Sequence, residues 1–133
     1  MKTRLAATLA AFALLAACSI TPTPADRDEE GVKAALTEWV ETALHGNMSA
    51  DMTKRYCEEL VTKRARESAA YLCAGKPAVH TNPTWKDIDS IDSISITGDT
   101  ATITWWWHGQ DSTGRTQTTD TFIFEEGRWK HDN

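Results

Sequence analysis

The 133-residue sequence is short of cations and cysteines and has no apolar segment long enough to span a bilayer. Fourteen Lys and Arg residues stand against 19 Asp and Glu, which gives a formal net charge of −5 at pH 7. An acidic chain lacks the basic surface on which nucleic-acid binding depends, so we expect no nucleic-acid partner. The longest mainly apolar stretch, residues 5–17, is shorter than the roughly 20 residues that cross a bilayer core.

Several motifs that would identify an enzyme or a metal protein are also missing. The four histidines (His45, His80, His108 and His131) show no spacing typical of a metal site. We find neither a glycine-rich phosphate loop nor a nucleophile elbow. The sequence therefore predicts no metal and no cofactor, and no local motif indicates catalysis.

The amino terminus has the order of features of an export signal. Lys2 and Arg4 precede the apolar stretch, which ends in the segment Leu15-Ala-Ala-Cys18. Its length is typical of a secretory signal peptide. The segment resembles the lipobox of bacterial lipoproteins, and the resemblance implies cleavage after residue 17 and a diacylglyceryl group on the Cys18 thiol. The alternative is an ordinary signal peptide in which Cys18 is incidental.

A lipidated Cys18 would hold the protein in the bacterial cell envelope, on the extracytoplasmic face of a membrane. Removing residues 1–17 removes Lys2 and Arg4 and takes the net charge from −5 to −7, so an anionic membrane surface would repel the protein itself. Two or three acyl chains anchor a protein stably, whereas one chain binds only marginally. We expect residues 18–27, with their two Thr-Pro pairs, to form a tether and residues 28–133 to form a single domain.

Two cysteines remain after Cys18, namely Cys57 and Cys73. Disulfides persist in exported proteins. On one straight helix the two residues would lie about 24 Å apart, whereas a disulfide needs Cα atoms within roughly 7 Å. The sequence therefore predicts a disulfide and a chain that turns back between the cysteines, with two free buried thiols as the alternative.

The first half of the chain has helical periodicity. One apolar face is formed by Val32, Leu36, Trp39, Val40, Ala43 and Leu44. Asp26 and Glu29 are typical of a capping pair, and Gly46-Asn47 is expected to end this helix. A second helical region begins near Ser49 and either continues or kinks before Gly75.

From about Ile88 the period changes to two, which indicates strands. Turn signals lie at Gly98-Asp99, at residues 111–114 and at Glu126-Gly127. The sequence thus predicts an α+β fold in which two to three helices pack on one face of a four-stranded antiparallel meander.

The turns also predict the register. They place Ile96 opposite Ala101, Trp105 opposite Asp120 and Ile103 opposite Phe122, and they pair Phe124 with Trp129 and Phe122 with His131. Most large apolar side chains then face the helices. Three residues face outward and form a candidate interface with a second copy or an envelope protein: Ile91, Trp106 and Ile123. The alternative for Trp106 is a surface tryptophan that packs flat on its neighbours.

Polar residues share the predicted inner face. A carboxylate beneath helices costs several kcal/mol unless it is paired or hydrated. We therefore predict a pocket at this end of the sheet, lined by Asp92, Trp105, Trp107, Asp120 and His131. The alternatives are that the tryptophans are plain core and that a bulge in the first strand leaves the acidic residues at an exposed rim.

The turn Gly98-Asp99-Thr100-Ala101, the cysteine pair and the ending Phe124-Glu-Glu-Gly-Arg-Trp129-Lys130 resemble the NTF2-like, cystatin-like superfamily, in particular its small bacterial lipoproteins. The resemblance covers roughly residues 28–133. It implies a curved, cone-shaped sheet, a cavity between helix and sheet, and frequent dimers through the outer face. Ketosteroid isomerase-like relatives perform acid–base chemistry in the cone, where Asp92 or Asp120 would be the base and His131 or Tyr56 the proton donor.

Together these features favour a non-enzymatic, membrane-anchored module that binds a small apolar ligand or a protein partner. The alternatives are a ketosteroid isomerase-like enzyme and a purely structural envelope protein.

Overall fold

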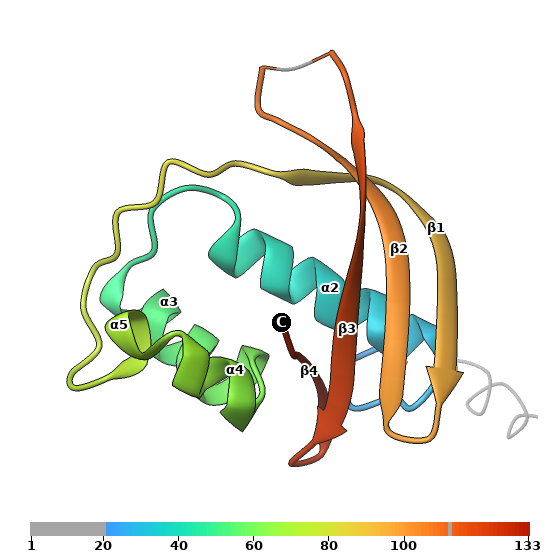
Figure 1. Cartoon of the computed structure of the whole chain (residues 1–133), viewed down its shortest axis with the longest axis horizontal. Helices are drawn as coiled ribbons and strands as arrows, with labels where there is room; N and C mark the ends of the chain where they lie inside the picture. The colour runs from blue at the N-terminus through green and yellow to red at the C-terminus, as the bar shows by residue number, and fades with distance from the viewer. Residues whose placement is uncertain (1–20, 112) are drawn as a thin grey trace, which may run out of the picture.

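The computed structural model describes residues 21–111 and 113–133, so the predicted signal segment and Cys18 lie outside the described residues. This part of the chain is α+β, with four α-helices followed by a four-stranded antiparallel sheet of order β1-β2-β3-β4. The helical elements are α2 (Glu29–Ala43), α3 (Ala50–Arg55), the π-helical turn η1 (Tyr56–Leu60), α4 (Lys63–Ser68) and α5 (Ala70–Cys73). The strands are β1 (Asp87–Thr97), β2 (Thr100–His108), β3 (Thr116–Glu125) and β4 (Arg128–His131). Helix α2 crosses one face of the sheet, and α3, α4 and α5 gather beyond the β4 edge (Figure 1).

Helix α2 begins later than the predicted capping pair would require. Its N-cap is Asp28, whose Oδ1 accepts a hydrogen bond from the Gly31 amide at 3.0 Å. Asp26 is not the cap, as its carbonyl oxygen instead accepts a hydrogen bond from Trp129 Nε1 at 2.8 Å. Pro24 is buried, and its carbonyl accepts from the Trp129 amide. The end of the predicted tether is therefore part of the folded body.

The helical region between the cysteines is broken rather than continuous. Ser49 caps α3, and Thr62 caps α4 after Val61 leaves the helical conformation. This reversal brings Cys57 and Cys73 to a Cα separation of 5.6 Å with their sulfur atoms at bonding distance, 2.06 Å. The predicted reversal of the chain between the cysteines is confirmed, although the number of separate helices exceeds the predicted two to three.

Strand β1 contains two bulges, and these correct the predicted faces. Asp89 and Asp92 are the extra residues, since Ile88 pairs with Trp107, Ile91 with Trp105 and Ile94 with Ile103. Each bulge adds a residue and so reverses the alternation beyond it. Ile91 was predicted to face outward and Asp92 inward, and both predictions were wrong for this reason.

The pairing of β2 with β3 differs from the predicted register by two residues. Asp120 lies opposite Ile103, not Trp105, and Phe122 lies opposite Ala101. The connection between the strands is longer than the predicted four residues, because β2 ends at His108 and β3 begins at Thr116. A shift of two keeps every side chain on its predicted face. The pairings across Gly98-Asp99 and Glu126-Gly127 are confirmed.

The core lies between α2 and the inner face of the sheet. Trp105 and Trp129 are each only 1% exposed and are its largest members. The whole cluster consists of Val32, Ala35, Leu36, Val40, Ala101, Ile103, Trp105, Phe122 and Trp129. Burial of such large aromatic rings supplies much of the apolar area that a small protein needs.

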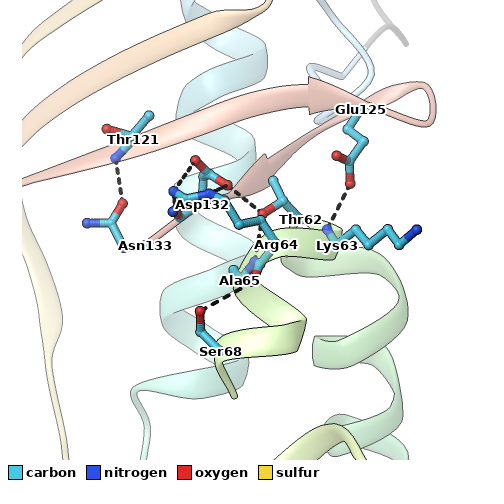
Figure 2. Close-up of polar contacts among 9 residues, drawn as sticks. All are labelled: Thr62, Lys63, Arg64, Ala65, Ser68, Thr121, Glu125, Asp132 and Asn133. Atoms are coloured by element: carbon cyan, nitrogen blue, oxygen red, sulfur yellow. Dashed lines mark hydrogen bonds and ion pairs between the residues drawn. The ribbon is translucent and has the colours of Figure 1, made fainter. Parts of the chain in front are cut away.

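The last residues attach α4 to the free edge of β4. Figure 2 shows Thr62 Oγ1 and the Arg64 guanidinium converging on the Asp132 carboxylate, at 2.6 and 2.7 Å. Nearby, the Thr62 amide donates to the His131 carbonyl at 2.9 Å. The edge strand is thus covered by the α4 segment, which removes a site of edge-to-edge association.

Candidate functional site

A buried hydrogen-bonded network occupies the place where the sequence predicts a pocket. Trp105 Nε1 donates to Asp120 Oδ2 at 2.7 Å, and His131 Nε2 lies 2.8 Å from Asp120 Oδ1. The His131 ring stacks on Trp39 of α2, with centroids 3.7 Å apart. Asp120 is 8% exposed and His131 is 5% exposed. The network connects three strands with α2 through the centre of the protein.

The network stabilises the ionised form of Asp120. Burial alone would raise the pKa of this carboxyl, but the hydrogen bonds from His131 and Trp105 outweigh it and the pKa lies below its usual value. Both carboxylate oxygens are used by these two partners. A carboxylate with both oxygens engaged inside the core is suited to holding the sheet on α2 rather than to taking a proton from a ligand.

The remaining members of the predicted pocket lie elsewhere. Asp92 is exposed and accepts a hydrogen bond from Gln117 Nε2 at 3.1 Å, away from the buried network. Trp107 is half-buried, with Lys86 Nζ 4.4 Å above its ring. Tyr56 lines a smaller cavity beside Trp39. The four acid–base candidates from the sequence are therefore not assembled at one accessible place.

The three residues of the predicted interface do not form one patch. Trp106 is half-buried on the outer face, where the Arg115 guanidinium covers its ring at 4.3 Å. Ile123 pairs beside Thr100, six residues along β2 from Trp106, which is about 20 Å. Ile91 lies on the opposite, inner face. The outer face therefore presents a cation-capped tryptophan and a distant isoleucine.

An open groove lies between the second half of α2 and the end of the sheet where β1 begins and β2 ends. Its volume is about 550 Å³. Apolar side chains of Val40, Ile88 and Ile91 form one part of its lining, and Ile91 reaches it only because of the bulges in β1. The full lining is Thr37, Val40, Glu41, His45, Asp87, Ile88, Ile91 and His108.

Asp87 and two histidines form the polar end of this groove. His45 Nε2 lies 2.5 Å from Asp87 Oδ1, and His108 Nε2 lies 3.9 Å from Asp87 Oδ2. Trp85 Nε1 donates to Asp87 at 2.9 Å, and this bond together with the nearby histidines holds the pKa of Asp87 below its usual value despite partial burial. The carboxylate is therefore ionised at neutral pH.

The chain that enters β1 is held against the end of α2, which places these residues. The Gly46 amide donates to the Thr84 carbonyl at 2.8 Å, and the Lys86 amide donates to the Leu44 carbonyl at 2.7 Å. Gly46 has φ +85°, a conformation that side-chain-bearing residues rarely adopt. The result is the stacking of His45 on Trp85, with centroids 4.6 Å apart.

Sequence reasoning missed His45, Asp87 and His108 as site residues. A signal was present in the segment Ile88-Asp-Ser-Ile91-Asp-Ser-Ile94, where isoleucine recurs every third residue. Such spacing in a strand requires an extra residue per repeat if all isoleucines face the core, and it therefore indicates bulges. Two bulges in this segment would have placed Asp87, rather than Asp89, opposite His108.

No group of three or more His, Cys, Asp and Glu side chains within residues 21–111 and 113–133 is arranged to hold a metal ion. No helix in the same part of the chain is long and apolar enough to cross a membrane. No family model, curated protein or solved structure matches the chain.

Proposed function

We propose that the protein is a lipid-anchored extracytoplasmic binding module of the NTF2-like type, whose groove between α2 and β1 binds a small, partly apolar molecule. The observation that carries this proposal is the groove itself. Its volume of about 550 Å³ falls within the range of small-molecule sites. It also combines an apolar wall with a few ionisable groups, which is the composition that gives such sites affinity and orientation.

Binding is a better account of this geometry than the acid–base chemistry of ketosteroid isomerase-like enzymes. That chemistry requires a basic oxygen accessible to substrate in the cone. Here the space is filled by Trp105 and Trp129, and Asp120 is enclosed with both oxygens engaged. The groove instead lies at the rim, where a ligand can enter without displacing the core.

The predicted anchor would hold the groove near a membrane. Thr23 and Asp26 exchange hydrogen bonds at the start of the folded body. Thr23 is five positions after Cys18, and the chain spans at most about 18 Å over these positions when fully extended. A lipid on Cys18 would therefore keep the sheet and α2 close to the surface, where a membrane-derived or periplasmic small molecule is encountered.

The proposal is tested by titrating n-hexanol into the exported full chain carrying Cys18→Ser, which removes the lipid acceptor. We expect saturable amide NMR shifts centred on Val40, Ile88 and Ile91, because the alkyl chain contacts the apolar wall of the groove. Thr37 is exposed at the rim, so Thr37→Trp should fill the groove without disturbing the core and abolish the shifts.

Thr102→Trp is the matched control, since Thr102 is exposed on β2 and does not line the groove. This variant should bind as the parent does. Shifts that do not saturate, or that persist unchanged in Thr37→Trp, would refute binding in the groove.

A further inference from the structure

The charges of the groove are unbalanced. Two of its lining residues, Glu41 and Asp87, are carboxylic acids, and none is Lys or Arg. The lysine nearest in sequence, Lys86, is positioned over the Trp107 ring and does not line the groove. With histidine counted as neutral, the lining carries two negative charges beside an apolar wall.

Glu41 is the carboxylate that is free to meet a ligand. It is exposed, and no ion pair or hydrogen bond of its side chain occurs in the described part of the chain. Thr37 and Glu41 lie four residues apart on one face of α2, and His45, which follows the end of the helix, also lines the groove. Asp87, in contrast, already accepts from Trp85 and contacts His45.

We infer that the ligand of this groove is a small organic cation, an ammonium group on an apolar body. This inference rests on the proposed function. The apolar body would contact Val40, Ile88 and Ile91, while the ammonium would donate to Glu41 and lie within the field of Asp87. An anion of the same shape would meet two carboxylates and be repelled.

The size of the groove favours a small molecule over the lysine side chain of a protein partner. A volume of about 550 Å³ accommodates a compact ligand. A specific protein partner would need a contact surface on the order of 800 Å² on each side, which extends well beyond such a groove. On the outer face, the Arg115 guanidinium covers the Trp106 ring, so this tryptophan does not present a bare aromatic surface to a protein partner.

Three six-carbon probes of similar size distinguish the possibilities: hexylamine, n-hexanol and hexanoate, titrated by NMR at pH 8 into the exported full chain carrying Cys18→Ser. An alkylamine is protonated and a carboxylate is ionised at this pH. We expect hexylamine to bind about fivefold or more tightly than hexanol, the ratio that one ion pair at about 5 Å gives in a solvated groove. Hexanoate should bind more weakly than hexanol.

Glu41→Gln should weaken hexylamine binding about fivefold, which leaves only the attraction of Asp87, while hexanol binding stays unchanged. Glu67→Gln is the control, because Glu67 is exposed on α4, lies outside the groove and changes the net charge equally. This variant should keep the preference for the amine.

Hexanol binding as tight as hexylamine would overturn the inference and leave the proposed function standing. An amine preference that Glu41→Gln does not reduce would overturn it equally. Absence of saturable binding for all three probes would instead contradict the proposed function itself.

Discussion

Three adjacent tryptophans illustrate how differently one residue type is used in this protein. Trp105 is core and donates a hydrogen bond to a buried carboxylate. Trp106 lies on the outer face beneath an arginine, and Trp107 lies on the inner face beneath a lysine. Alternation along β2 alone separates these environments. The indole nitrogen of Trp105 matters most among the three, because its partner Asp120 is buried and has little access to solvent that could replace the bond.

Trp105→Phe should lower the free energy of unfolding by about 1–3 kcal/mol, since Asp120 Oδ2 loses its donor while remaining buried. The loss is measured by urea denaturation at pH 7. Trp107→Phe is the control, because the Trp107 indole nitrogen makes no hydrogen bond in the described residues and the ring is half-buried. Equal destabilisation by both variants would contradict a specific role of the Trp105–Asp120 bond.

The same bond determines a pH dependence. Asp120 has a folded-state pKa below its usual value of 3.8, so its contribution is complete above that pH and is lost as pH falls through the folded pKa. Trp105→Phe removes one of the bonds that lower this pKa and should therefore move the acid loss to higher pH in the same denaturation series. Asp132, held by Arg64 and Thr62, contributes in the same direction and is unchanged by the substitution.

At the scale of elements, the sequence predicted those features that depend on residues close together in the chain. The antiparallel meander, two of its three turns and the reversal between Cys57 and Cys73 follow from periodicity and chain geometry. The second register did not follow, because the length of the connection after β2 is not encoded by a single turn motif. The bulges of β1 determine which residues reach the groove. A prediction that assumes a strict period of two along the strand does not find them.

Deleting Asp92 tests the bulge directly. Removal of the extra residue leaves Ile91, Ser93 and Ile94 in plain alternation, so they keep their partners Trp105, Thr104 and Ile103 and both isoleucines still face α2. The deletion should therefore change the free energy of unfolding by less than about 1 kcal/mol, read from urea denaturation. Asp92→Ser keeps the chain length and should be nearly neutral, because Asp92 is exposed and loses only its bond with Gln117. A loss of roughly 2–4 kcal/mol on deletion, the cost of exposing two partly buried isoleucines, would contradict the placement of Asp92 as the extra residue of the strand.

At the scale of the whole molecule, the core and the groove divide the space between α2 and the sheet. Val32, Ala35 and Leu36 of α2 belong to the buried core with Trp129, while Thr37 and Glu41 line the groove. The sequence predicted a pocket on the inner face, and the groove in the structure has a different set of lining residues. Trp105, Asp120 and His131 close the interior, and His45, Asp87 and His108 surround the opening.

Occupancy of the groove in the cell is the central proposal. The measurement is native mass spectrometry of the full chain purified with detergent from the cells that produce it, compared with Thr37→Trp prepared identically. We predict a small basic molecule on the parent protein and none on the variant, in addition to the lipid on Cys18. A parent spectrum without any such adduct, or the same adduct on Thr37→Trp, would contradict the account.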